Sequence, residues 1–422
     1  MESLANDFVT VFTSPQSNNL FCYSPGLACL PNGRLIATLD LGGPGVAMLD
    51  GIRGAWCGIA VQGKILISDD HGITWIPRND FPFMHARPFV AGKSVYVLGH
   101  CRDLMIVRSD DGGDTWTPPV KLTHDQSWSQ APCNVHYVHG CIYLVMEQEV
   151  PRGIRGWTVA SMAPVLMRGR VDADLTCREN WTLASSAPFV DVADTAHMDS
   201  FGVPFFATIP NESTYPAPGR EMAPVGWLES NVVQFVDPNH LWHDPAGRTF
   251  HIWMRAHTGG TGYACMVKVV EQGAQPGTGA METMLEKVPS GKTILFVPCP
   301  GGQMKFHILY DEPTKLYWLL STQATDSMTR IDRLPSNRYN LPNNERRRLQ
   351  LHFSKNMVDW CFAGIVAIGQ PVEQASRHYA SMVIDGADLC ILSRSGDQYA
   401  ATAHNGNLIT FHRVRDFRRL VY

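Results

Sequence analysis

Two histidines in the first part of the chain combine a residue type and a spacing suited to proton transfer. His85 stands near the start of an apolar run, residues 83–89, and His100 follows the next run, residues 93–98. A returning connection would bring the end of the second run beside the start of the first. Imidazole exchanges protons near neutral pH, so the pair could serve as general base and general acid. We predict catalysis by His100 and His85; the alternative is that each is a hydrogen-bonded structural histidine.

Arginines offer the planar fork that binds carboxylate groups. Arg220 is a candidate because its loop, residues 218–221, precedes an expected inner strand. Arg87 and Arg377 are further candidates, and Arg102 is a weaker one. The alternative for each is an exposed surface arginine, which is the favoured interpretation for Arg102.

Polar residues also alternate with apolar neighbours where a strand is expected. Glu229 and Asn231 lie on the run 226–233, so both side chains are predicted to face the same side of a sheet and could line a channel. Other polar residues are predicted to share this binding role: Gln130, Gln303, Lys305, Tyr379 and His404. The alternative is polar lining of a water-filled channel. Arg255, between His251 and His257, is instead predicted to pack between sheets.

Carboxylate pairs would support a different chemistry. Most glycoside hydrolases use two Asp or Glu residues on either side of the scissile bond. Glu229 with Glu147 or Asp199 could supply such a pair.

Metal motifs are missing from the sequence. It has no HExxH, no CxxC and no EF-hand-like loop, so a catalytic zinc has no support and metal ligands stay unknown. We expect no cofactor to be required for the chemistry.

A repeated octapeptide sets the architecture that must position these residues. Residues 68–75 and 109–116 both fit S-x-D-x-G-x-T-W, the Asp-box. The Asp can accept hydrogen bonds from its own turn, the Gly can take a positive φ, and the Trp can pack over the turn. Residues 354–360 resemble a shortened box without its Gly. We predict structural turns, and a repeat at this spacing indicates one sheet per unit of a β-propeller.

Successive units can be laid along the chain. They cover residues 22–75, 85–116 and 132–181, a unit that starts at 226, one from 301 to 360, and one from 377 to 415. We treat the irregular segment 185–235 as a degenerate blade. The prediction is therefore an all-β, single-domain propeller over residues 1–422, with seven four-stranded antiparallel blades, or six as the second choice. The run 8–12 is expected to pair with the last blade and close the ring.

Composition sets the broad class. The 422 residues are 45% hydrophobic and 18% charged, with a net charge of −4, which gives no argument for nucleic acid or anionic membranes. No apolar run is long enough to span a bilayer and no signal peptide is recognised at the start, so we expect a cytoplasmic protein or a mature secreted form. The eleven cysteines are scattered, and Cys133, Cys141 and Cys265 are predicted to be buried thiols. A monomer is expected.

The chain resembles the Asp-box superfamily, which includes sialidases. Sialidases carry an R-I-P-type motif on the first inner strand, whose Arg belongs to a triad that binds the sugar carboxylate. The matching stretch here, residues 23–30, keeps Pro25 but has no Arg, which argues against a sialidase. The stretches 226–231, 305–311, 316–320, 392–394 and 410–413 are more similar to L-rhamnose-α-1,4-D-glucuronate lyases and related rhamnosidases.

This resemblance implies an enzyme that releases L-rhamnose from glucuronate at the non-reducing end of acidic glycans of the gum arabic or arabinogalactan type. The reaction would be a β-elimination with His as base and acid, and related lyases suggest a calcium ion near the axis. Two alternatives stay open. One is an exo-acting hydrolase, rhamnosidase or sialidase-like, that uses carboxylates, and the other is a noncatalytic glycan-binding propeller.

Overall fold

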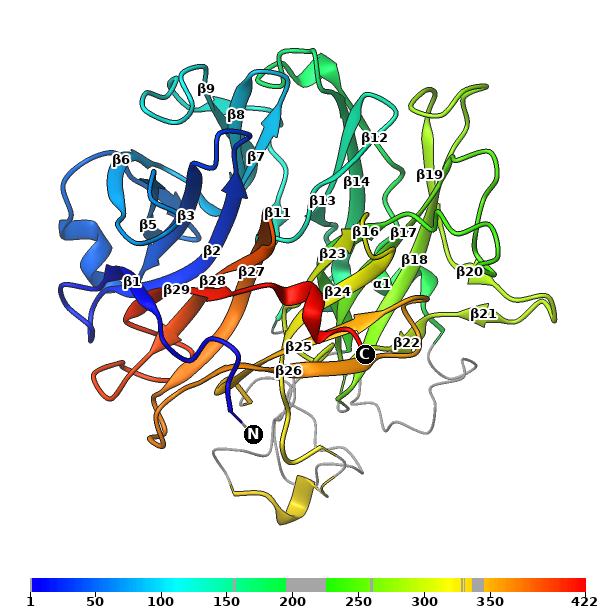
Figure 1. The fold of residues 1–422 in the computed structure, drawn as a ribbon. Coiled ribbons are helices and arrows are strands. Elements are labelled where there is room, and N and C mark those ends of the chain that lie inside the picture. Colours follow the sequence, from blue (N-terminus) through cyan, green and yellow to red (C-terminus); the bar gives the residue numbers. More distant parts are fainter. Residues whose placement is uncertain are drawn as a thin grey trace.

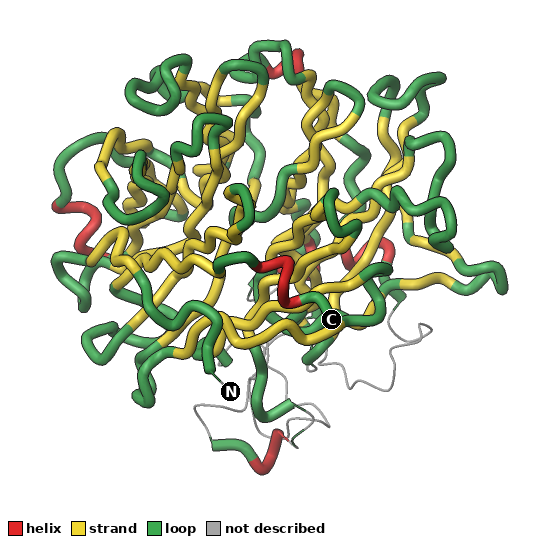
Figure 2. Tube along the Cα trace, in the orientation of Figure 1, coloured by secondary structure: helices red, strands yellow, loops and turns green. Residues whose placement is uncertain are grey.

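The computed structural model describes residues 2–154, 157–194, 225–258, 261–327, 329, 331–335 and 345–422. Within them, strands dominate and the longest helical segments are single short turns (Figures 1 and 2). The strands form antiparallel sheets arranged around a common centre, as expected for a propeller. The all-β prediction is therefore confirmed.

The first three blades follow one another along the chain. The first contains β2 (Phe21–Cys29), β3 (Leu35–Gly42), β5 (Ile59–Ser68) and an outer strand in two pieces, β4 (Gly54–Trp56) and β6 (Ile76–Phe81). The second contains β7 (Met84–Ala91), β8 (Ser94–Cys101), β9 (Asp103–Ser109) and β10 (Val120–Lys121). The third contains an inner strand in two pieces, β11 (Trp128–Ser129) and β12 (His136–Val138), then β13 (Cys141–Glu149), β14 (Met162–Arg170) and β15 (Trp181–Leu183).

Three more blades complete the described part of the chain. The fourth contains β16 (Gly226–Val233), β17 (Thr249–His257), β18 (Tyr263–Glu271) and two outer pieces, β19 (Met281–Met284) and β22 (Phe296–Pro298). The fifth contains β23 (His307–Asp311), β24 (Leu316–Thr322), β25 (Arg348–Ser354) and β26 (Cys361–Ile368). The last contains β27 (Ser376–Asp385), β28 (Asp388–Gly396), β29 (Leu408–Val414) and β1 (Val9–Thr13). A small separate ribbon joins β20 (Glu286–Lys287) to β21 (Thr293–Ile294).

The blade number differs from the first prediction. The described residues form six blades, which was the second choice, and not seven. The expected degenerate blade, residues 185–235, does not form a sheet of its own in its described parts. Its last residues become β16, the innermost strand of the fourth blade, and residues 195–224 lie outside the described part. The error arose because the irregular segment was counted as a blade in addition to the unit that starts at 226, to which β16 belongs.

The N-terminal strand closes the ring, as predicted. Strand β1 pairs antiparallel with β29 and places Val9 opposite Phe411 (Figure 1). The outermost strand of the last blade therefore comes from the other end of the chain, which joins the two termini across one sheet and covers its free edge.

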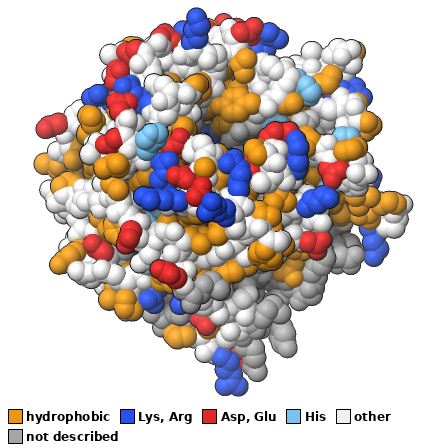
Figure 3. Space-filling model, viewed as in Figure 1, with side chains coloured by type: hydrophobic (Ala, Val, Ile, Leu, Met, Phe, Trp, Pro, Cys, Tyr) orange, Lys and Arg blue, Asp and Glu red, His pale blue; other side chains and the backbone are white. Residues whose placement is uncertain are grey.

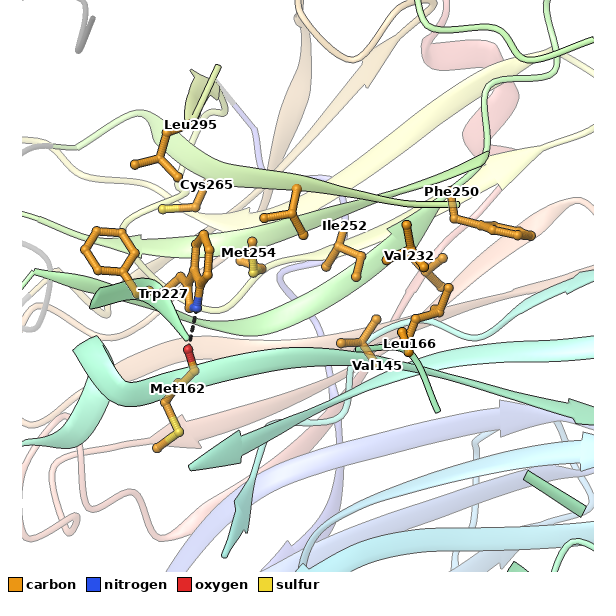
Figure 4. Close-up of a cluster of buried hydrophobic side chains, with 14 of the residues drawn as sticks. Val145, Met162, Leu166, Trp227, Val232, Phe250, Ile252, Met254, Cys265 and Leu295 are labelled. Carbon is orange, nitrogen blue, oxygen red and sulfur yellow. Dashed lines mark hydrogen bonds between the residues drawn. The ribbon is translucent and has the colours of Figure 1, made fainter. Parts of the chain in front are cut away.

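Hydrophobic cores fill the interfaces between neighbouring blades. The described residues contain six such clusters, and each joins two adjacent blades around the ring. Figure 4 shows the one between the third and fourth blades, where Val145 and Leu166 lie near Val232 and Ile252. The buried Trp227 indole donates a hydrogen bond of 2.6 Å to the carbonyl oxygen of Met162 across the same interface. Each blade thus buries both faces, which makes its strands nearly continuous apolar runs.

The Asp-boxes are structural turns between the third and fourth strands of their blades, as predicted. In the first, Asp70 accepts hydrogen bonds from the backbone and hydroxyl of Thr74, at 2.8 and 2.6 Å. Gly72 has a φ of 91°, and the Trp75 indole donates to its carbonyl oxygen. The shortened box replaces the Gly with Met357, at a φ of 64°. The polar groups of these turns form hydrogen bonds within the turn itself, which supports a structural role.

The cysteines are free thiols, and the surface carries charges of both signs. All eleven cysteines are free, and Cys133, Cys141 and Cys265 are buried as predicted. Charged side chains of both signs lie among one another on the face shown in Figure 3. None of the described helices has the length and apolar character needed to cross a membrane.

Candidate active site

The strand order places one set of residues at the end of the ring opposite the Asp-boxes. The Asp-boxes follow the third strand of a blade, and the first strand runs parallel to the third because all pairs are antiparallel. The start of each innermost strand and the end of each second strand must therefore lie at the other end of the ring. We call this end the bulge face, for the feature described next.

Four innermost strands carry the same irregularity. The pairing register shifts in β2, β7, β16 and β27, next to one residue with a positive φ in each. These residues are Ser24, His85, Glu229 and Tyr379, with φ values of 37°, 54°, 62° and 51°. Such bulges re-aim side chains and are frequent beside active sites, and a positive φ in a non-glycine residue costs about 1–3 kcal/mol. Three of the four residues were predicted site residues.

Tyr379 and Glu229 meet although they come from different blades. The Tyr379 hydroxyl donates a hydrogen bond of 2.5 Å to Oε1 of Glu229. Arg255, at the end of β17, donates from Nη1 to the same hydroxyl at 2.9 Å and lies 3.5 Å from Oε2 of Glu229. Glu229 and Arg255 are buried, whereas Tyr379 is half-buried. The three residues form a compact unit, which we call the Tyr–Glu–Arg unit.

Two further arginines lie near the Tyr379 ring. The guanidinium carbon of Arg346, just before β25, lies 5.6 Å from the ring centre, and that of Arg394, near the end of β28, lies 5.3 Å from it. Arg346 donates to Nδ1 of His378 at 3.1 Å. Because an arginine can only donate, His378 must be neutral at that nitrogen. A cleft of about 780 Å³ opens alongside, and Arg346 and His404 form part of its wall.

Burial and the neighbouring charges shift the pKa values of these groups. Burial, and then the Glu229 charge, raise the pKa of Tyr379 to about 12, so its hydroxyl is protonated at neutral pH. Burial lowers the pKa of Arg346 to about 9, with Arg394 and Arg255 acting in the same direction. Arg394 and then burial lower the pKa of His404 to about 2. The cluster thus combines protonated arginines with neutral histidines, a combination suited to binding an anion.

The predicted histidine pair is in contact. Nδ1 of His85 lies 2.9 Å from Nε2 of His100, and the backbone N–H of His85 donates to Asp40. His100 is fully buried and His85 is half-buried. Burial, and then Arg394, lower the pKa of His85 to about 3, and burial lowers the pKa of His100 well below its usual value. Both rings are therefore neutral at pH 7, and His85 is a weak base.

Several predicted binding residues hold the blades together. Arg87 donates to the Gln130 side chain and to the carbonyl of Val145, while Gln130 itself donates to the carbonyl of His85. Asn231 bonds the backbone of Phe306 and Ile308 in the next blade. Their role in substrate binding stays a prediction.

Three other predicted residues are also bonded to backbone groups. Lys305 donates to the carbonyl of Ala380, and burial lowers its pKa to about 8. Gln303 donates to the carbonyl of Thr322. Arg377 donates to the carbonyl of its neighbour Ser376. Their binding role is likewise untested.

The remaining candidates divide into buried and undescribed residues. Glu147 is fully buried, and its Oε1 accepts hydrogen bonds from the backbone and hydroxyl of Ser230 at 2.9 and 2.6 Å. Burial raises its pKa to about 7. Arg220 and Asp199 lie outside the described residues. No group of three or more His, Cys, Asp or Glu in the described ranges could hold a metal ion, and the calcium expectation stays a prediction.

Sequence reasoning missed the arginines. Arg255 was predicted to pack between sheets, yet its guanidinium reaches Tyr379. Arg346 was not singled out because it follows residues without a strand pattern, and Arg394 was noted only as part of a likeness. One signal was available: Arg255 and Arg394 both lie near the end of a second strand, as His100 does.

Comparisons with known proteins agree with this fold. No protein-family model matches the sequence, and no curated protein matches it. The Hadza microbial sialidase Hz136 superposes with a TM-score of 0.55 at 15% identity, over 97% of this chain and 68% of that chain. A Trypanosoma rangeli sialidase in complex with the inhibitor DANA gives a TM-score of 0.54 at 11% identity, over 98% of this chain and 60% of that chain.

A third similarity is weaker. The GH93 α-L-arabinofuranosidase of Fusarium graminearum in complex with arabinobiose superposes with a TM-score of 0.48 at 11% identity, over 98% of both chains. At these identities the comparisons establish the fold alone: this chain has the fold of sialidase-like β-propellers.

Proposed function

We propose that the protein is a glycoside hydrolase that removes an acidic sugar from the non-reducing end of a glycan, with Tyr379 as its nucleophile. The observation that carries this proposal is the Tyr–Glu–Arg unit, in which the hydroxyl of one half-buried tyrosine contacts both a carboxylate and a guanidinium. Sialidases are an exception to the two-carboxylate rule because they use a tyrosine nucleophile. The fold supports this class of reaction by analogy only.

The proposed reaction runs through the Tyr–Glu–Arg unit. Glu229 accepts the hydroxyl proton as Tyr379 Oη forms a bond to the anomeric carbon and the glycosidic C–O bond breaks. Arg255 stabilises the negative charge that develops on the phenolic oxygen. The leaving oxygen takes a proton from solvent at the open side of the site. Water then displaces Tyr379 from the sugar, Glu229 returns its proton to the tyrosine, and the proton released by the water passes to solvent. Every role assigned to the protein belongs to a side chain, so the proposal needs no cofactor.

The arginines define the substrate class within this proposal. The guanidinium carbons of Arg346 and Arg394 lie 5.6 and 5.3 Å from the centre of the ring that carries the reacting oxygen. A sugar held there would carry a carboxylate near its anomeric carbon, because guanidinium groups pair with carboxylates in a fork. This supports an acidic sugar over a neutral one such as rhamnose or arabinose.

The second candidate is the rhamnose–glucuronate lyase, and the contact between His85 and His100 favours it. A β-elimination needs a base for the proton at C5 of the uronate. The low pKa of His85 makes that ring a poor base at neutral pH, so hydrolysis stands first. Both reactions share an acidic glycan as substrate.

The test is turnover of a panel of 4-methylumbelliferyl glycosides, whose leaving group needs little protonation. The panel holds the glycosides of sialic acid, glucuronic acid, rhamnose and arabinose. In parallel, rhamnosyl-glucuronate oligosaccharide is incubated and followed by ultraviolet absorbance. Hydrolysis of an acidic glycoside supports the proposal. Rhamnose release with the absorbance of an unsaturated uronate would replace it with the lyase, and turnover of neutral glycosides alone would contradict the substrate class.

A further inference from the structure

The four bulges of the bulge face are held in the same way. In each, the residue after the positive-φ position is hydrogen-bonded to a side chain from the blade before it around the ring. The bonds join Ser381 to Pro25, Thr38 to Ala86, Glu147 to Ser230 and Lys305 to Ala380. A positive φ in a non-glycine residue persists only where the surrounding structure holds it. The repeated arrangement therefore indicates that these side chains maintain the bulges.

Glu147, near the end of β13, holds the bulge that carries Glu229. It is fully buried, and its Oε1 accepts hydrogen bonds from the backbone and the hydroxyl of Ser230. Its Oε2 has no hydrogen-bond partner among the described residues, so in those ranges every side-chain hydrogen bond of Glu147 goes to the residue next to Glu229. A buried carboxyl is costly, and an apolar side chain would fill the same space without that cost. This favours a role for Glu147 in fixing the bulge.

Lys305 holds the bulge that carries Tyr379. It lies just before β23 and is buried, and its Nζ donates to the carbonyl oxygen of Ala380 and to the hydroxyl of Ser381, the latter at 3.1 Å. These two residues directly follow Tyr379 on β27. Both bulges that supply the contact between Tyr379 and Glu229 are thus held by a buried ionisable side chain. At the bulges of Ser24 and His85, by contrast, a neutral hydroxyl contacts the following residue.

We infer that Glu147 and Lys305 are positioning residues, which fix the bulges of β16 and β27 so that Glu229 can take the proton of Tyr379. The catalytic part of this inference rests on the proposed function. Glu229 and Tyr379 come from different blades, so the 2.5 Å contact between them depends on the conformation of both bulges. A displacement of about 1 Å can lower a rate by about a hundredfold. For Lys305, this role replaces the predicted contact with substrate.

Two substitutions of Glu147 separate its reach from its charge. Glu147→Gln keeps the length of the side chain and an oxygen that can accept from Ser230, but has no charge. Glu147→Asp keeps the carboxyl on a side chain one methylene shorter, which withdraws it from Ser230. The kcat of Glu147→Asp is expected to fall by about tenfold to about a hundredfold with KM nearly unchanged, whereas Glu147→Gln should keep most of the wild-type kcat.

Two further variants complete the series. Lys305→Met keeps the stem but removes the bonds to Ala380 and Ser381, and its kcat should fall as in Glu147→Asp. The matched control is Glu271→Asp, because Glu271 is also buried but lies at the Asp-box end of the ring, at the end of β18, where it pairs with Arg168. The control should lose stability and keep its kcat.

Crystal structures of the wild type and Glu147→Asp test the inference without any turnover. Glu147→Asp is expected to lose the positive φ at Glu229 and the contact between Glu229 and the Tyr379 hydroxyl. An unchanged bulge with an unchanged contact would overturn the inference, whatever reaction the protein performs. If the bulge is lost but the wild type hydrolyses no acidic glycoside, the proposed function fails while the role of Glu147 in holding the bulge is supported.

The kinetic outcomes decide the catalytic part. A reversed order, with Glu147→Asp near the wild type and Glu147→Gln impaired, would show that Glu147 acts through its charge and would overturn the inference. An equal loss of kcat in Glu271→Asp would also overturn it, because general destabilisation would then explain the effect. Should Glu147→Asp fail to fold, Lys305→Met takes its place in both measurements, and an unchanged bulge at Tyr379 with full kcat would contradict the inference.

Discussion

The Asp-box turns and the bulges show opposite designs at the two ends of the ring. In the second Asp-box, Asp111 accepts hydrogen bonds from the backbone and hydroxyl of Thr115, and these bonds hold the pKa of its carboxyl far below its usual range. At the bulge face, Glu229 and Tyr379 instead reach across the ring to each other. The turns solve a local problem within eight residues, whereas the bulges assemble groups from separate blades.

This difference separates stability from function. A local turn repeats in sequence because each copy needs the same residues, and its polar groups are satisfied within it. The bulges share a backbone shape but carry Ser24, His85, Glu229 and Tyr379 in turn. The shape is repeated and the chemistry is not, which is the pattern expected when a scaffold presents different side chains to one ligand.

The largest expected effect is on turnover at the bulge face. Tyr379→Phe and Glu229→Gln should each lower kcat by about a thousandfold or more, because each removes a member of a unit that acts together. Thermal stability should change little, since both substitutions keep the shape of the side chain. Rates with a methylumbelliferyl glycoside and melting curves check this. Retained turnover in both variants would contradict the claim that the bulge face carries the chemistry.

Arg255→Met should have the next largest effect. Loss of the donor to the Tyr379 oxygen is expected to lower kcat by about a hundredfold to about a thousandfold, as for other groups that stabilise developing oxyanions. The effect should fall mainly on kcat rather than on KM. A rise in KM alone would mean that Arg255 binds substrate and leaves the chemistry to other residues.

The Asp-box turns should respond in stability alone. Gly72 has a φ of 91°, and a Cβ there would lie 2.2 Å from the Phe411 ring, so Gly72→Ala should cost about 1–3 kcal/mol of unfolding free energy. Gly140→Ala is the matched control: it has a φ of 69° but open space, and should cost less. Denaturant unfolding measures both, and kcat/KM should stay unchanged. If folded Gly72→Ala protein lost activity, the Asp-box turns would contribute to catalysis, and the separation from the bulge face would be wrong.

Acid should weaken the fold through its buried histidines. The folded-state pKa values of His85 and His100 are lowered, so below the ordinary histidine pKa of about 6.5 the unfolded chain binds protons that the folded chain does not. Stability is therefore present above pH of about 6.5 and is lost as the pH falls towards 3, by up to about 1.4 kcal/mol per pH unit for each such group. Unfolding at several pH values tests this. His100→Gln should flatten the dependence, and an unchanged slope would show that His100 titrates normally.

Features formed within short stretches of sequence were predicted, whereas contacts between side chains of different blades were not. The two Asp-boxes, the closing strand β1 and the all-β class followed from patterns within short windows. The contact of His85 with His100 also followed, because the two residues face each other across one hairpin. Arg255, Arg346 and Arg394 could not be grouped, since three blades contribute them and their neighbours in sequence give no common motif. The predicted number of blades was wrong for a similar reason, because the irregular sequence of residues 185–225 gives no clear boundary between one blade and the next.

The most direct test of the account is to trap the reaction on Tyr379. The probe is a glycoside of an acidic sugar with fluorine on the carbon next to the anomeric carbon and with a good leaving group. The fluorine slows both steps, but the good leaving group keeps formation of the bond to Tyr379 faster than its hydrolysis, so the adduct accumulates. Digestion and mass spectrometry should then find the sugar attached to the peptide that contains Tyr379, and the adduct should be missing in Tyr379→Phe. Release of the sugar with no adduct on Tyr379, or with an unsaturated product, would contradict the proposed mechanism.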